Sequence, residues 1–148
     1  MIKYIITSET AFAGEATLTY DENGERPIFD CFNTNVRPDQ HKWFMRWICE
    51  RAIDQNTLTG IINAGATGPF KFKEITFEPT FADFWARYFK DRLKDNSSKR
   101  RTEIKWNRMS KSEQLAAYNH IGKYFANIPA GIQPKYAETY LNSELWNN

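Results

Sequence analysis

Alternating apolar and polar residues predict that the first half of the chain is rich in β-strands. The clearest signal is a hairpin over residues 16–32, in which Asn23-Gly24 supplies the residue pair that favours a tight turn. Further β-branched and aromatic runs occur at both ends of this half. We therefore expect three or four strands, with candidates at residues 3–7, 16–20, 27–32 and 70–77.

The pattern between the hairpin and the last strand changes to a helical period. Pro38 suits the first position of a helix that continues to about Gln55. One face of this helix is formed by Phe44, Trp47, Ile48, Arg51 and Ala52. The three glycines within 55–69 predict a loop there, with a short apolar piece at 60–62.

Four aromatic residues dominate the start of the second half. Phe81, Phe84, Trp85 and Tyr88 recur at i, i+3, i+4 and i+7, which places their rings on one face of a helix reaching about residue 93. Thr80 can cap this helix. Rings at this spacing are typical of a core, and the alternative is a base-stacking platform.

Three more helices are expected after a polar loop at 94–98. The first, over 98–109, should bury Ile104, Trp106 and Met109. The second begins with the capping box from Ser110 to Glu113 and ends before Pro129. Its predicted apolar face consists of Leu115, Tyr118, Ile121, Gly122 and Phe125. A short helix at 136–141 follows, and Trp146 is expected to pack.

These patterns predict an α+β protein with two units. Residues 1–79 form a small sheet, built on a β-hairpin or meander, with one packed helix. Residues 80–148 form a helical basic module of three to four helices.

The composition and the N-terminal sequence indicate the cellular compartment in which the protein is expected. No apolar run approaches the roughly 20 residues that span a bilayer, and the N-terminus does not resemble a secretory signal. Cys31 and Cys49 both lie among apolar residues, which favours reduced core thiols over a disulfide. We therefore expect a cytoplasmic protein of a bacterial host cell, without a membrane partner.

The two halves differ in charge. Residues 1–80 carry eight Lys/Arg and eleven Asp/Glu, whereas residues 81–148 carry twelve and seven. A dense basic stretch lies within the second half, where Arg101, Lys105 and Arg108 should share a helix face opposite Ile104. The candidate nucleic-acid-binding residues are Lys94, Lys99, Arg100, Arg101, Lys105, Arg108 and Lys111. Such a face can bind phosphates without reading base sequence, or it can be an ordinary solvated surface.

The second half also resembles a known family. Its order of landmarks is similar to the C-terminal module of phage and prophage replication-associated proteins, of the replisome-organiser or helicase-loader type. The matching positions are Phe81, Phe84, Trp85, Tyr88, Lys99–Arg101, Trp106, Met109, Tyr124, Thr139–Asn142 and Glu144–Trp146. The resemblance covers about residues 80–148 and implies a phage or prophage context near DNA replication, with a replication protein such as a helicase as a possible partner.

No catalytic or metal-binding pattern accompanies these features. His41 and His120 have no Cys or His at ligand spacing, and the glycines of 60–68 lack the lysine of a phosphate-binding loop. We therefore expect no cofactor, no metal and no enzymatic activity.

Two functions remain open. The first is a DNA-replication accessory protein that contacts single- or double-stranded DNA, or a replication protein, through the basic helix face. The second is a phage protein-interaction or assembly module, as a possible homodimer, that does not bind nucleic acid. Charge reversal at 99–101 separates them, because only the first requires those cations.

Overall fold

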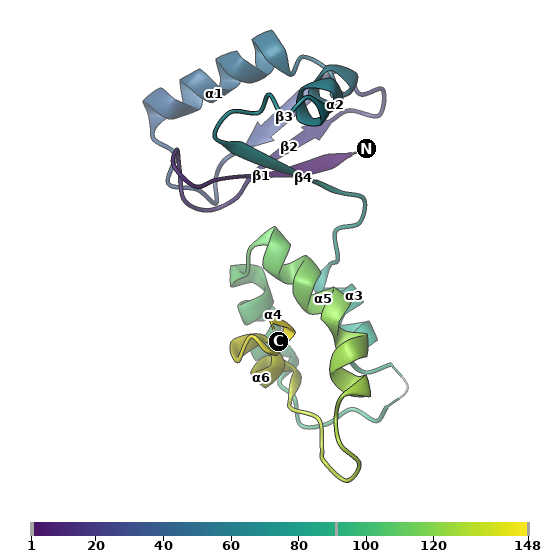
Figure 1. The fold of residues 1–148 in the computed structure, drawn as a ribbon. Helices are drawn as coiled ribbons and strands as arrows, with labels where there is room; N and C mark the ends of the chain where they lie inside the picture. The colour runs from purple at the N-terminus through teal and green to yellow at the C-terminus, as the bar shows by residue number, and fades with distance from the viewer. Residues whose placement is uncertain (1, 91, 148) are drawn as a thin grey trace. The chain divides into compact units, whose positions relative to one another are not determined.

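The computed structural model describes residues 2–90 and 92–147. The chain divides into two compact units, Met1–Phe77 (unit 1) and Glu78–Asn148 (unit 2), each with its own hydrophobic core. The first unit contains the sheet together with helices of its own, and the second unit is helical (Figure 1). The predicted α+β class is confirmed. None of the described helices has the length and apolar content needed to cross a bilayer.

Unit 1 is built on a four-stranded antiparallel sheet. The strands are β1 (Lys3–Ser8), β2 (Ala16–Tyr20), β3 (Pro27–Asp30) and β4 (Phe70–Ile75), in the order β3-β2-β1-β4. The predicted hairpin is β2–β3, and Gly24 in its turn adopts φ +77°. Asp21 closes this turn, because its carboxylate accepts hydrogen bonds from the backbone N–H groups of Asn23 and Glu25.

The register places one row of side chains from each strand on the same face. Tyr4 lies opposite Leu18, and Leu18 lies opposite Phe29. Helix α1 (Pro38–Arg51) covers this face with Phe44 and Ile48. Figure 1 shows that α1 lies on the same side of the sheet as a second helix, α2 (Gln55–Asn63).

Helix α2 corrects two predictions, namely a loop over 55–69 and one helix on the sheet. The Asp54 carboxylate accepts a hydrogen bond from the backbone N–H of Thr57, which caps the helix. The first residue is fixed by tertiary structure, since the Gln55 N–H donates to the Gly24 carbonyl at 2.8 Å. Leu58 is fully buried in the core of unit 1. This burial stabilises a helix that Gly60 weakens locally.

Gly60 provides a test of that account. A Cβ added at Gly60 would have no heavy atom within 4 Å. We expect Gly60→Ala to stabilise the protein by about 0.5–1 kcal/mol, measured by urea denaturation, because alanine loses less backbone entropy in a helix. Gly65→Ala is the matched control. It also has open space, but its φ of +68° disfavours a side chain, so it should destabilise instead. Destabilisation by Gly60→Ala would contradict the assignment of Gly60 to a helix interior, and stabilisation by Gly65→Ala would contradict the positive φ of Gly65.

Unit 2 contains the helices α3 (Phe81–Tyr88), α4 (Lys99–Arg108), α5 (Lys111–Ala126) and α6 (Ala137–Asn142), followed by the 3-10 turn η1 (Leu145–Asn147). Both predicted capping boxes are present, at Thr80–Asp83 and Ser110–Glu113. Helix α3 ends at Tyr88, before the predicted end near residue 93. Asp91, within that predicted end, lies outside the described residues.

The aromatic residues of α3 form the core of unit 2, as predicted. Phe84 and Tyr88 are fully buried, and Phe81 and Trp85 pack against the same cluster. The Phe84 ring stacks on Trp106, with 5.0 Å between ring centroids. These rings therefore support the fold and do not form a base-stacking platform. Trp146 is also buried, which confirms its predicted packing.

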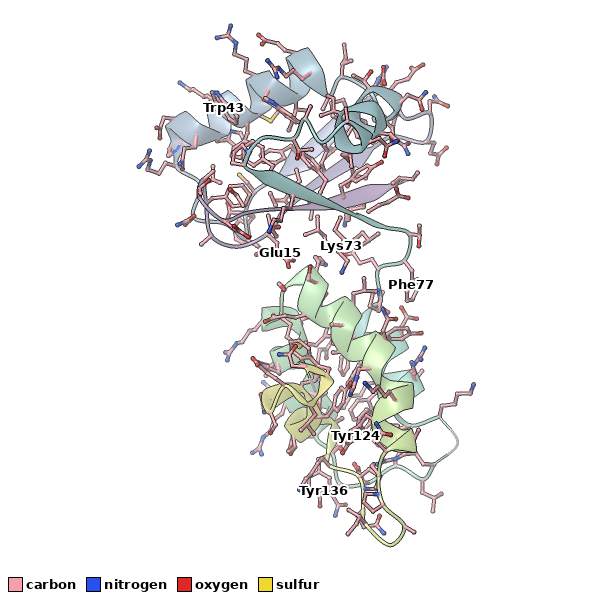
Figure 2. The ribbon with its side chains drawn as sticks, viewed as in Figure 1. Glu15, Trp43, Lys73, Phe77, Tyr124 and Tyr136 are labelled. Atoms are coloured by element: carbon pink, nitrogen blue, oxygen red, sulfur yellow. The ribbon has the colours of Figure 1, made fainter. Side chains whose placement is uncertain are left out.

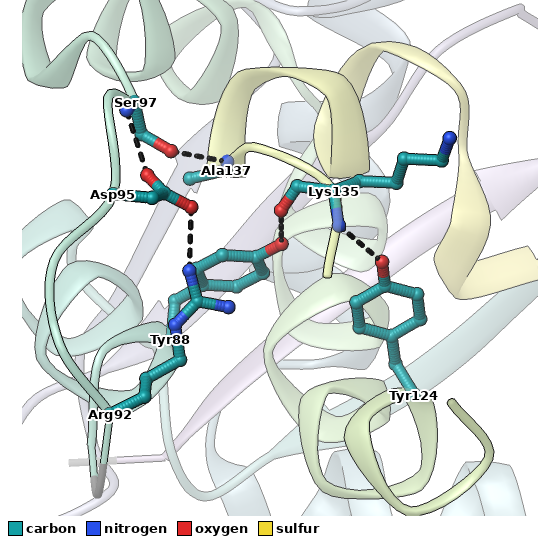
Figure 3. A network of polar contacts seen from close by, with 7 residues as sticks. All are labelled: Tyr88, Arg92, Asp95, Ser97, Tyr124, Lys135 and Ala137. Carbon is teal, nitrogen blue, oxygen red and sulfur yellow. Dashed lines mark hydrogen bonds and ion pairs between the residues drawn. The ribbon is translucent and has the colours of Figure 1, made fainter. Parts of the chain in front are cut away.

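A polar network fixes the segment between α3 and α4 to the start of α6 (Figure 3). The Arg92 guanidinium pairs with Asp95 at 2.5 Å, and the same carboxylate accepts a hydrogen bond from the Ser97 N–H. The Ser97 hydroxyl then accepts from the N–H of Ala137. The Arg92 guanidinium also lies over the rings of Tyr88, Phe89 and Phe125, at 5.1–5.3 Å from their centroids. The Arg92 guanidinium is therefore held by one carboxylate and by three aromatic rings around it.

Candidate nucleic-acid interface

Helix α4 carries the central part of the predicted basic stretch. Its buried residues are Thr102 and Trp106, which are one turn apart. Thr102 can be buried because its hydroxyl donates to the Ser98 carbonyl at 2.7 Å, so the polar atom of its side chain has a partner. The Ser98 side chain caps the helix by accepting from the N–H of Arg101.

The prediction that Ile104 is buried is wrong. Its exposed fraction is 44%. Successive helical residues are about 100° apart, so Ile104 points away from the side on which Thr102 and Trp106 pack. Arg100 and Arg108 lie four residues before and after it, and Ile104 therefore shares the exposed face with the arginines instead of opposing them.

Three arginines form the exposed basic surface of α4. Arg100, Arg101 and Arg108 are exposed, and among the described residues none forms an ion pair with a carboxylate. We call Arg100, Arg101 and Arg108 the α4 arginine face. Because guanidinium groups bind phosphate oxygens bidentately, this surface suits a phosphate backbone.

The other predicted residues have different environments. Lys111 forms an ion pair with Glu78 at 2.5 Å, with both side chains about one third exposed, so its charge is already balanced. Lys105 is only partly exposed, at the border of the buried side. The Lys99 ammonium lies 6.0 Å from the centroid of the Trp85 ring. Lys94 is exposed in the loop before α4. The structure therefore places three of the seven predicted residues together on one exposed helix face, where no described carboxylate pairs with them.

A second cationic surface was not predicted from the sequence. A groove of about 850 Å³ lies between α3 and α5, and Arg87 and Lys90 contribute cations to it. The Arg87 guanidinium lies over the Tyr118 ring, 4.6 Å from its centroid. The sequence did contain a pattern that indicates this surface, because Asp83, Arg87 and Lys90 follow helical spacing on the side of the helix opposite the aromatic residues.

Ionisable groups inside unit 2 are held in definite states. Burial raises the pKa of Tyr88 and of Tyr140, so both phenols remain neutral hydrogen-bond donors. Tyr88 donates to the carbonyl of Lys135, and Tyr140 donates to the carbonyl of Ala117. The hydrogen bond from the Thr80 backbone lowers the pKa of Asp83, which keeps the capping carboxylate ionised.

The predicted apolar face of α5 is confirmed at Ile121, Tyr118 and Phe125, which contribute to the core of unit 2, and needs correction at its other positions. Ala117, Ile121 and the polar Gln114 are the buried residues, whereas Gly122 is exposed. Gln114 is accommodated because its side-chain amide donates to the Trp106 carbonyl at 2.8 Å. That carbonyl lies in the last turn of α4, so the bond satisfies a helix-end acceptor and fixes α5 against α4.

The cysteines and histidines do not form a site. Cys49 is exposed on α1 and is not the core thiol that was predicted, while Cys31 is partly buried against the core; neither forms a disulfide. Among residues 2–90 and 92–147, no group of three or more His, Cys, Asp or Glu side chains is placed to hold a metal ion. Trp43 on α1 is half exposed (Figure 2) and lines two smaller grooves of unit 1.

Comparison with known protein families relates part of unit 2 to a described domain. Residues 76–144 match the family model described as the Legionella vir region protein LvrA C-terminal domain. No curated protein and no solved structure matches the chain. The family description names the vir region and not replication, so the replication context stays a prediction. The segment that contains the α4 arginine face and the groove between α3 and α5 is thus similar to the LvrA C-terminal domain.

Proposed function

We propose that the protein is a non-enzymatic accessory factor that contacts the phosphate backbone of nucleic acid through the α4 arginine face. One observation carries this proposal: three exposed arginines lie on one side of a single helix, and no described carboxylate pairs with them. A solvated helix face typically includes compensating acidic residues within ion-pair distance. Glu103 is the only acidic residue of α4, and it forms no ion pair with these arginines.

The expected mode is phosphate contact without base reading. Each arginine that binds a phosphate releases condensed counterions, so affinity falls steeply as salt rises. Ile104 at the centre of the face adds an apolar contact for sugar or base edges. Thr102 and Trp106, the other side of the helix, are committed to the core.

The biological setting proposed is DNA replication in a phage or prophage. It is supported by the resemblance of residues 80–148 to modules of replication-associated proteins. A protein partner such as a helicase fits the same role. The match to a domain of a vir region protein neither requires nor contradicts this setting.

A protein-binding function is the second candidate, and the exposure of Ile104 favours it. An apolar side chain among arginines is also typical of the centre of a protein interface. The two candidates differ in what the arginines do. For nucleic acid they supply most of the binding energy, whereas for a protein partner they contribute mainly to orientation and association rate.

The test is fluorescence anisotropy with labelled single-stranded and duplex DNA across a salt titration. We expect the variant Arg100→Glu/Arg101→Glu/Arg108→Glu to lose binding at all salt concentrations. Partial replacement by glutamine should lower the slope of log affinity against log salt by about 0.7–0.9 per arginine that contacts a phosphate.

The matched control changes the net charge equally at exposed lysines outside the basic stretch of residues 94–111. It is Lys42→Glu/Lys123→Glu/Lys135→Glu, which should retain most of the affinity. Equal losses in both variants would show that only net charge matters. Absence of binding by the unmodified protein at low salt would exclude the proposed function and leave the protein-binding candidate.

A further inference from the structure

The groove between α3 and α5 contains a cation, Arg87, that has an aromatic support but no hydrogen-bond acceptor among the described residues. Arg87 is partly buried, and its guanidinium carbon lies 4.6 Å from the centroid of the Tyr118 ring, which is a cation–π contact. No described side chain or carbonyl accepts a hydrogen bond from it. A guanidinium carries five N–H donors, so most of its binding capacity faces the groove or solvent.

Of the other charged side chains that line the groove, Asp83 and Arg92 have partners, and only Lys90 has none among the described residues. The Asp83 carboxylate is occupied by the backbone and side chain of Thr80, as the cap of α3. Arg92 is paired with Asp95 and surrounded by rings. Lys90, one turn beyond Arg87, is exposed and forms no ion pair with a described residue. The groove therefore offers two available positive charges to a ligand.

The wall facing these cations is apolar. Ile121 and Phe125 of α5 contribute to it, and Ala86 contributes from α3. The absence of a side chain at Gly122 leaves the wall open beside Arg87, because a Cβ built there would lie 3.8 Å from the guanidinium Nη2. A volume of about 850 Å³ lies within the range of pockets that hold small organic ligands. The ligand that fits has a negative charge next to a flat, largely apolar group.

We propose that this groove binds one unstacked nucleotide of a single strand. Its base stacks on the guanidinium plane of Arg87, which Tyr118 supports from behind, and its phosphate contacts Lys90. Bases stack on arginine planes as they do on aromatic rings, but only when they are unpaired and can leave the helix. The inference rests on the proposed function and adds to it a preference for single strands over duplex.

The test exploits the open position at Gly122. Gly122→Glu places a carboxylate within reach of Arg87, where it can pair with the guanidinium and occupy the groove. We expect this variant to bind a single-stranded oligonucleotide about tenfold more weakly, while its duplex affinity changes less than about twofold. Gly122→Gln is the neutral control of nearly the same size, and it should lose less. Arg87→Met, which keeps the length but not the charge, should reproduce the loss.

Amide chemical shifts give a second, independent readout. Titration of the unmodified protein with deoxyadenosine monophosphate should shift the amide signals of Arg87 and Gly122 more than those of the α4 arginine face. Gly122→Glu should abolish these shifts. Its melting temperature should not fall, since glutamate is a better helix former than glycine.

The outcomes separate the two proposals. If the α4 variant loses binding but Gly122→Glu and Arg87→Met keep the same ratio of single-strand to duplex affinity, the groove proposal is wrong and the proposed function stands. If the unmodified protein binds neither DNA form, both are wrong. If a phosphoserine peptide binds with the same dependence on Arg87 and the oligonucleotide does not, the groove recognises peptide phosphate and the nucleotide assignment is overturned.

Discussion

Replacement of Trp106 by alanine should unfold much of unit 2 under mild denaturing conditions. Trp106 is 2% exposed, and its ring stacks on Phe84, which in turn stacks on Tyr140. Removing a buried tryptophan leaves a cavity and costs about 3–5 kcal/mol, a large share of the roughly 5–15 kcal/mol that stabilises a domain. Urea denaturation followed by circular dichroism measures the loss.

Trp43→Ala is the control for this experiment. Trp43 is 51% exposed on α1, so its replacement removes a ring of the same size from a largely solvated position. We expect a loss below about 1 kcal/mol. Similar losses in the two variants would contradict the assignment of Trp106 to the core and of Trp43 to the surface.

Asp95→Ala should have the second-largest effect. Asp95 and Arg92 are only 21% and 18% exposed, and the same carboxylate also orders Ser97, which holds the start of α6. Removing one partner of a partly buried ion pair leaves the other charge uncompensated, at a cost of about 2–3 kcal/mol. The free energy of unfolding should therefore fall by about this amount.

The double variant Arg92→Met/Asp95→Ala should be more stable than Asp95→Ala alone. Methionine keeps contact with the rings of Tyr88 and Phe125 without burying a charge. The exposed pair Arg46–Glu50 is the control, and Glu50→Ala should leave the unfolding midpoint nearly unchanged. A double variant less stable than Asp95→Ala would mean that Arg92 does not depend on its carboxylate partner.

Local signals in the sequence determined much of the fold. The hairpin followed from strand alternation and the residues that favour its turn. Helices α3 and α5 could be placed because their capping residues are close in sequence to the backbone groups that they bind. Burial of Phe84, Tyr88 and Trp106 was also predictable, since large rings at helical spacing on a small unit must find a core.

The tertiary structure decided which face each polar helix buries. Helix α4 has few apolar residues, so its pattern did not show whether Ile104 or Thr102 is inside. Trp106 determines the answer, because its ring must reach Phe84 and Thr102 lies one turn before it on the same side. Helix α2 was missed for a related reason: its glycine favours a loop locally, and burial of Leu58 against the sheet outweighs that preference.

The candidate site depended even more on contacts between distant residues. The sequence showed that residues 94–111 are basic, and this much was determined by composition alone. Composition did not determine which of these cations are available to a ligand. Lys111 pairs with Glu78, 33 positions away, whereas Arg100, Arg101 and Arg108 have no described carboxylate partner. The position of Arg87 over Tyr118 likewise exists only once α3 and α5 pack together. The sequence shows where each charged residue lies in the chain, but the tertiary structure determines which other group it contacts.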